Sequence, residues 1–239
     1  MLLEICAGNY ESAFNAHRSG IKRIELCSEL SVGGITPSYG LLKQTVELVS
    51  LEIMVLIRPR SGDFNYTASD FDIMKEDIRL CKLLGCHGIV SGVLHANGAI
   101  DKERTQELIA LSKPLPFIFH RAFDHVPDQL HGLETLVELG AKRVLTSGGA
   151  PRAIDGIAQL KKLKNVAQNR ICIMPGGGIN VQNIKRFREA GFTEIHAALT
   201  TLVKQHELEL VPMNSPKNLQ ENSYLYTQEQ SIKELIAVI

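Results

Sequence analysis

The sequence lacks three features that would place it in other classes of protein. Lys plus Arg equals Asp plus Glu at 26 each, so the chain has no excess of positive charge for binding nucleic acid. No apolar run approaches the roughly 18 residues of a membrane span, and no basic-then-apolar leader follows Met1. We therefore expect a cytoplasmic protein that binds neither nucleic acid nor membranes.

The chain also has few cysteines, and their number is odd. Five cysteines do not suit a disulfide framework, and a chain with 44% hydrophobic residues can build a core without one. We expect free thiols throughout. Cys81, Cys86 and Cys172 are predicted at helix, turn and core positions, which leaves Cys6 and Cys27 as candidates for chemistry.

No Pro-, Gly- or Ser-rich linker interrupts an alternation of apolar strands and amphipathic helices. Eight strands are predicted, near residues 2–6, 22–27, 53–58, 87–91, 116–120, 142–146, 171–174 and 193–196. Helices are predicted near 9–19, 38–50, 67–84, 101–111, 128–139, 150–165 and 180–190. Helical crossovers force parallel pairing, so the pattern favours a (β/α)₈ TIM barrel of one domain, 1–239, over an open doubly wound sheet.

The C-terminal part departs from this alternation. Prolines and asparagines predict an irregular loop over 205–224, which is a candidate for a subunit contact. A terminal helix is predicted over 227–239.

Two Glu-x-Cys units end the first two predicted strands. Glu4 shares a strand face with Cys6, and Glu25 with Cys27, because side chains alternate along a strand. A carboxylate would be costly on the helix-covered face, so we expect both units to point into the barrel at its mouth. Two thiolates there are suitable ligands for Cu(I), although buried cysteine is also an ordinary core residue.

Basic residues follow the third strand. Arg58 and Arg60 are expected on one face at the barrel mouth. Paired guanidinium groups bind a carboxylate or phosphate well, and they could equally neutralise Glu4 and Glu25.

The fifth strand ends in the densest cluster of polar residues. His120 is a candidate proton carrier, Arg121 an anion-binding residue and Asp124 an orienting carboxylate. His95 and His125 are expected to be surface residues without a role.

Glycine turns follow the sixth and seventh strands, and His196 ends the eighth. TIM barrels often bind phosphate in loops near their last strands, and backbone N–H groups at such turns are suitable donors. Glycines also simply permit tight turns, and no Walker motif is present. The predicted ligand-binding residues of these loops are Ser147, Gly148, Gly176, Gly177, Gly178 and His196.

Six segments together resemble the signature segments of the CutC family. They are LEIC (3–6), RIELC (23–27), GGITPS (33–38), IRPR with GDF (57–60, 62–64), FHRAFD (119–124) and RVLTSG (143–148). The resemblance implies a cytoplasmic TIM barrel, often oligomeric, implicated in copper homeostasis, with Cu(I) ligands at Cys6 and Cys27. The chain departs from the family pattern after His196, so nothing that the family places there is carried over.

Two functions therefore compete with a pure scaffold. In one, the protein handles copper by binding Cu(I) at Cys6 and Cys27. In the other, an enzyme acts on a small anionic metabolite that carries phosphate or carboxylate. Arg58, Arg60 and the turns at 147–149 and 176–178 would hold the anion, and the proton carriers would be Glu4, Glu25, His120 or Asp124. No organic cofactor is predicted, and a homo-oligomer is expected.

Overall fold

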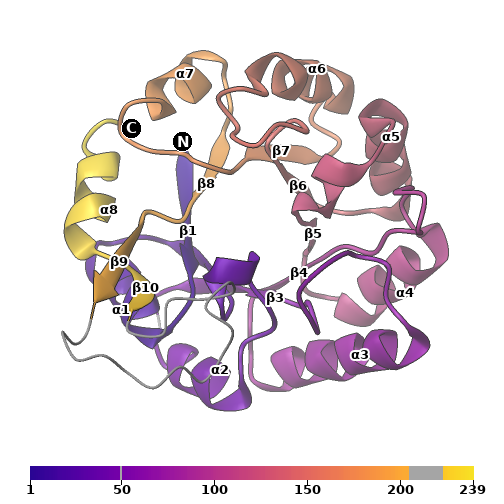
Figure 1. Cartoon of the computed structure of the whole chain (residues 1–239), viewed down its shortest axis with the longest axis horizontal. Coiled ribbons are helices and arrows are strands. Elements are labelled where there is room, and N and C mark those ends of the chain that lie inside the picture. The colour runs from indigo at the N-terminus through magenta and orange to yellow at the C-terminus, as the bar shows by residue number, and fades with distance from the viewer. Residues whose placement is uncertain (49, 205–222) are drawn as a thin grey trace.

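The protein is a (β/α)₈ barrel, as predicted from the sequence (Figure 1). The computed structural model describes residues 1–48, 50–204 and 223–239. Eight parallel strands pair in the order β7-β6-β5-β4-β3-β2-β1-β8, and a bridge between Gly176 and His196 links the two ends of this sheet. The strands are β1 Leu2–Ala7, β2 Arg23–Leu26, β3 Glu52–Leu56, β4 Gly88–Ser91, β5 Phe117–Phe119, β6 Arg143–Thr146, β7 Cys172–Pro175 and β8 Glu194–Ala197.

Helices surround this barrel, and polar caps define many of their ends. Thr67 and Asp70 form a capping box at the start of the third helix, and Gly140 adopts a positive φ of 84° where the fifth helix ends. The helices are α1 Tyr10–Arg18, α2 Tyr39–Thr45, α3 Ala68–Leu83, α4 Lys102–Ser112, α5 Gln129–Leu139, α6 Ile157–Ala167, α7 Ile184–Glu189 and α8 Glu229–Ile236, with 3₁₀ helices η1 Leu30–Val32 and η2 Arg121–His125. None of the described helices is long and apolar enough to cross a membrane.

Two separate hydrophobic cores result from side-chain alternation along the strands. Residues such as Ile5 and Ile53 face outward and pack against the helices. The alternate positions face inward and form a small core inside the barrel. Its members are Cys6, Cys27, Met54, Leu56, Val90, Ile118, Leu145 and Met174. The expectation that both Glu-x-Cys units point inward is therefore confirmed for their thiols.

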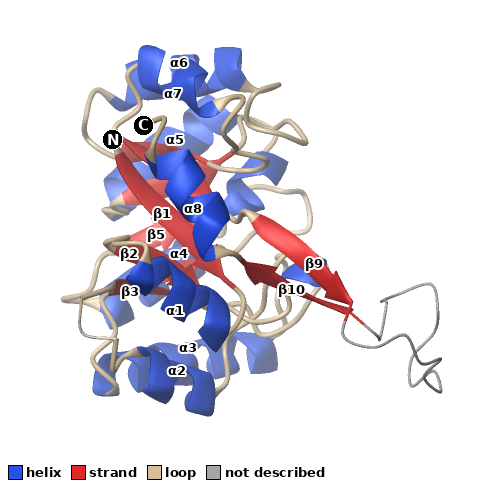
Figure 2. Cartoon of the chain, turned by 90° about the vertical axis from the view of Figure 1, so that its left-hand side faces the viewer, coloured by secondary structure: helices blue, strands red, loops and turns tan. Residues whose placement is uncertain are grey.

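The structure corrects the prediction for the C-terminal part. Strands β9 Thr200–Lys204 and β10 Ser223–Thr227 pair antiparallel and project from the barrel (Figure 2). Asn9 and Asn15 of the α1 region donate to carbonyls of β10, which fixes the base of this hairpin. The predicted loop, 205–224, thus extended too far, because residues 223 and 224 belong to β10. The remainder of that prediction, 205–222, lies outside the described residues. Helices α6 and α7 begin later than predicted, after glycine-rich turns.

Candidate ligand cavity at the carboxyl end of the barrel

A cavity of about 960 Å³ lies at the carboxyl ends of the strands. Loops that follow six of the strands contribute to its lining, so the barrel fold itself brings these side chains together. Its charged, imidazole and thiol groups come from Cys6, Glu25, Cys27, Arg58, Asp63, His95, His120, Arg121, Asp124, His125 and His196.

Two thiols lie on the barrel side of this cavity. The Sγ atoms of Cys6 and Cys27 are 3.8 Å apart, and the Cys27 thiol also lies 3.7 Å from the Ala7 carbonyl oxygen. Both residues are buried. The hydrogen bond with Cys27 and burial raise the pKa of the Cys6 thiol well above its ordinary value. A metal ion that binds Cys6 therefore has to displace a proton.

An imidazole and two carboxylates lie beside the Cys6 thiol. His196 Nδ1 is 2.8 Å from Glu4 Oε1, and His196 Nε2 is 3.4 Å from Glu25 Oε2. Burial opposes the charge of His196, but hydrogen bonds to Cys6 and Glu4 and the charge of Glu25 raise its pKa well above the ordinary value. Cys6, Glu25 and His196 offer ligand atoms within 4.8 Å of one another, the geometry of a possible metal site.

The two carboxylates differ in their surroundings. Burial raises the pKa of Glu25, against the charge of His196. Burial also disfavours the charge of Glu4, but His196 and Arg23 outweigh it and lower the pKa of Glu4. Glu4 is 1% exposed and is not part of the cavity wall, so its role in the structure is to hold His196 and Arg23.

Below the thiols, a row of ion pairs runs through the barrel interior. Arg23 Nε donates to Glu4 Oε2 at 2.6 Å, and Arg23 Nη2 donates to Glu194. Arg143 Nε donates to the same Glu194 carboxylate at 2.6 Å. Strand alternation predicts Arg23 on the same inward face as Glu25 and Cys27, and the structure confirms this position, although no role was predicted for Arg23.

Arg58 is buried and lines the cavity. Its Nη1 donates to the carbonyls of Val32 and Gly34, and its Nη2 donates to the carbonyl of Gly62, each at 2.8 Å. Within the described parts of the chain, no carboxylate lies within ion-pair distance of Arg58. The alternative in which Arg58 neutralises Glu4 and Glu25 is therefore wrong.

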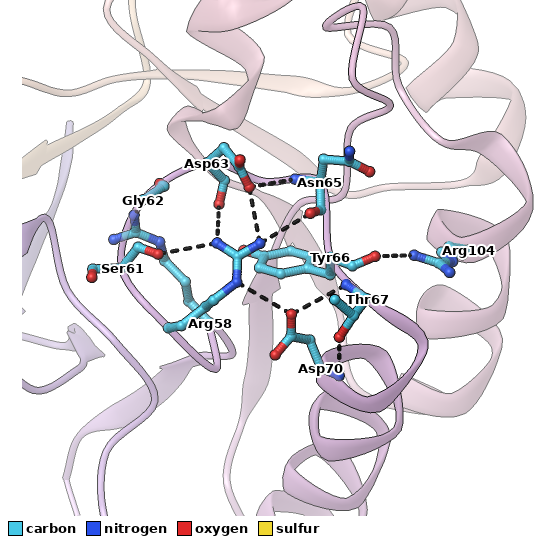
Figure 3. A network of polar contacts seen from close by, with 10 residues as sticks. Arg58, Ser61, Gly62, Asp63, Asn65, Tyr66, Thr67, Asp70 and Arg104 are labelled. Atoms are coloured by element: carbon cyan, nitrogen blue, oxygen red, sulfur yellow. Dashed lines mark hydrogen bonds and ion pairs between the residues drawn. The ribbon is translucent and has the colours of Figure 1, made fainter.

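Arg60 does not share a face with Arg58, contrary to the prediction. Its guanidinium group pairs with Asp63 at 2.9 Å and with Asp70 at 3.2 Å, and it lies over the Tyr66 ring. Figure 3 shows Asp63, Tyr66 and Asp70 in this polar network. The reason is that β3 ends at Leu56, so the alternation of a strand does not extend to residue 60. Arg60 fixes the loop before α3 and is not part of the cavity wall.

His120 is the N-cap of η2. Its Nδ1 accepts a hydrogen bond from the Ala122 backbone N–H at 3.2 Å, which places the imidazole proton on Nε2 in the neutral ring. Burial and the charge of Arg58 lower the pKa of His120 to about 3. Its Nε2 is buried and has no hydrogen-bond partner among the described residues.

Asp124 ties η2 to the loop after β6. Its carboxylate accepts hydrogen bonds from the Thr146 hydroxyl, the Ser147 N–H and hydroxyl, the Gly149 N–H and Arg121 Nε. Arg121 also donates to the Ser147 hydroxyl at 2.9 Å. These contacts occupy Asp124 and Ser147 structurally, and they leave the Arg121 guanidinium at the cavity rim.

The predicted glycine positions separate into two sets. Gly177 and Gly178 line the cavity with φ of +107° and +72°, which only glycine adopts readily. Gly148 instead packs on the backbone of Gly156, and Gly176 packs on Leu145 and His196, so neither belongs to the cavity wall.

Three further cavity residues were missed. The Phe64 ring lies 4.9 Å from the His120 ring and 5.6 Å from the His125 ring, measured between centroids. His95 and His125 are exposed, as expected, yet they line the cavity. In the sequence, the GDF segment (62–64) after the third strand could have identified Phe64 as a cavity residue.

Fold and site together define a TIM-barrel protein with a ligand cavity, containing two thiols, at the carboxyl end of its strands. The model of the CutC family matches residues 1–201. The human copper homeostasis protein cutC homolog is 50% identical over 198 residues, which cover 82% of this chain and 72% of that protein. CutC of Pasteurella multocida is 42% identical over 224 residues, 93% of this chain and 90% of its own length.

A crystal structure of CutC from Streptococcus agalactiae superposes with a TM-score of 0.79 at 37% identity, covering 82% of this chain and 98% of that one. The chain belongs to the CutC family, which confirms the resemblance seen in its motifs.

Proposed function

We propose that this protein takes part in copper homeostasis in the cytoplasm and binds Cu(I) through the thiols of Cys6 and Cys27. The observation that carries the proposal is the 3.8 Å separation of the two Sγ atoms at the base of an accessible cavity. Soft thiolates select Cu(I) over hard cations. Relatives with up to 50% identity are named copper homeostasis proteins, which supports the same role here.

The geometry of the thiol pair fits one metal ion. Metal–thiolate bonds of about 2.3 Å allow two sulfurs on one ion to lie at most about 4.6 Å apart, so both thiols can reach the same ion with little movement. A bis-thiolate Cu(I) complex carries one negative charge. His196, which lies beside Cys6, provides positive charge close to that position.

An anaerobic competition titration of the reduced protein with Cu(I) and a chromogenic chelator tests the proposal. We expect stoichiometric Cu(I) binding that is lost in Cys6→Ser/Cys27→Ser. The matched control is Cys81→Ser/Cys86→Ser, which removes two other buried thiols, remote from the cavity, and is expected to leave binding unchanged. Equal Cu(I) binding by both double variants would exclude the thiol site.

We also propose that the chain forms a homo-oligomer. The β9–β10 hairpin projects from the barrel, and Leu202 on β9 is 54% exposed, so this hairpin is the segment that we expect at a subunit contact (Figure 2). Light scattering of the parent and of Leu202→Lys tests it. A monomeric parent contradicts the proposal.

A further inference from the structure

Arg58 carries a buried positive charge in the cavity, and it makes no ion pair with any carboxylate of the described residues. The carbonyl groups around Arg58 satisfy its Nη atoms but do not neutralise its charge. The carboxylates of the same cavity have other cationic partners. Asp63 pairs with Arg60, Asp124 with Arg121, and Glu25 with His196. Because buried charges in proteins are normally paired, an anion is the missing element beside Arg58.

A second, independent observation points to the same kind of ligand. His120 is 5% exposed, and its Nε2–H is a buried donor that finds no acceptor in the part of the chain that the structure describes. The Ala122 N–H fixes the tautomer, so this ring presents a neutral donor. Most buried polar groups in native proteins are hydrogen-bonded, and a lone donor on a cavity wall calls for an acceptor atom in the cavity.

Both groups lie against the same aromatic ring. The Arg58 guanidinium carbon is 5.1 Å from the Phe64 ring centroid, and the His120 ring is 4.9 Å from it. The Arg121 guanidinium adds a third donor group and packs against Gly177, which also lines the cavity. The mouth of the cavity therefore carries one buried guanidinium that makes no ion pair with a described carboxylate, and two further donor groups, His120 and Arg121.

We propose that this mouth binds a small organic oxyanion, a metabolite that carries a carboxylate or phosphate group. His120 Nε2–H donates to an anion oxygen, Arg121 donates from the rim, and the anion compensates the charge of Arg58. A volume of about 960 Å³ is within the range of small-molecule pockets and exceeds what an inorganic ion fills. The site is distinct from the thiol pair and does not require copper.

Calorimetric titrations of the reduced, metal-free protein with sulfate, inorganic phosphate and succinate test the proposal. If sulfate and phosphate bind and succinate does not, the natural ligand carries a phosphate group. If succinate alone binds, the natural ligand carries a carboxylate. We expect His120→Asn to weaken binding about tenfold or more, since one hydrogen bond to a charged group is lost. Asn still caps η2 through its side-chain oxygen, which preserves the local fold.

The matched control is His131→Asn, the same change at an exposed imidazole outside the wall of this cavity, which should alter affinity less than twofold. A shift of the His120 Nε2–H resonance on adding sulfate to the parent provides a readout that needs no variant. Cys6→Ser/Cys27→Ser should keep full oxyanion binding, so failure of the copper proposal does not affect this one. Absence of binding of all three anions by the parent, or equal affinities of the His120 and His131 variants, overturns it.

Discussion

The charged residues inside the barrel differ between its middle and its mouth. In the middle, Arg23 is 1% exposed and binds two carboxylates, and each of these carboxylates has a second cationic partner. At the mouth, among residues 1–48, 50–204 and 223–239, the Arg58 guanidinium donates to carbonyl oxygens alone and the His120 Nε2–H has no acceptor. The interior thus contains one fully paired ionic layer and, above it, one incompletely paired layer.

This difference assigns a structural role to the charged residues in the middle of the barrel and a ligand-binding role to those at its mouth. A buried ionic layer in which every group is paired contributes to a unique fold, and removal of one member leaves a costly unpaired charge. Groups that stay unpaired reduce stability unless a ligand completes them, so their presence around a cavity points to binding. The following variants should accordingly affect stability in the middle layer and ligand binding at the mouth.

The largest effect is expected from Arg23→Met. The change leaves Glu4 buried with only His196 as partner, and breaking a buried ion pair typically costs about 3–5 kcal/mol. Urea unfolding followed by circular dichroism measures it. Arg23→Met/Glu4→Gln should recover part of the loss because the stranded charge is gone. If the single variant unfolds at the midpoint of the parent, the paired layer contributes no stability.

A smaller loss is expected from Asp124→Ala, at the wall of the mouth. The change leaves Thr146, Ser147 and Gly149 donors without their acceptor, and such losses amount to about 2–3 kcal/mol in total. Urea unfolding again provides the measurement. Asp124→Asn, which keeps one accepting oxygen, should lose less. Equal stability of the parent and Asp124→Ala would return Asp124 to the role of a proton carrier predicted from the sequence.

The pH dependence of stability should reveal His120. Its pKa falls from 6.5 to about 3 on folding, under burial and the charges of Arg58 and His125, with Asp124 opposing. Below pH 6.5 the unfolded chain binds a proton at His120 that the folded chain does not, so the His120 contribution to stability falls as the pH drops from 6.5 toward 3 and is constant above pH 6.5.

At pH 5 the His120 contribution amounts to a loss of about 2 kcal/mol relative to pH 7. Unfolding curves at both pH values measure it. His120→Asn should lose correspondingly less stability between pH 7 and 5. Parallel pH profiles of the parent and His120→Asn would mean that the imidazole titrates normally.

The fold could be predicted from the sequence because its signals are local. Each strand is an apolar run, and helix ends are marked by glycines such as Gly85 and Gly140, both at positive φ. The β9–β10 hairpin was missed for the opposite reason. Its two strands are short, only partly buried and separated by 18 residues, 205–222, so their pairing depends on contacts with α1 that no local pattern reveals.

The site was only partly predictable. Strand alternation placed Cys6 and Cys27 inside the barrel, because both lie within or directly beside a strand. The same rule failed for Arg60, which lies in a loop where no alternation holds. Whether Arg58 has a counterion, or His120 an acceptor, depends on the three-dimensional positions of distant loops, and the sequence does not contain that information in readable form.

The smallest effect is expected from Arg60→Gln. This variant tests whether Arg60 belongs to the surface loop before α3 or to the anion-binding mouth of the cavity. Arg60 pairs with Asp63 and Asp70 at the surface, where ion pairs contribute little, so the melting temperature should hardly change. Sulfate affinity should stay within twofold of the parent, whereas Arg121→Gln should reduce it severalfold. A clear loss of sulfate affinity in Arg60→Gln would place Arg60 at the anion after all, and would reinstate the paired-arginine site predicted from the sequence.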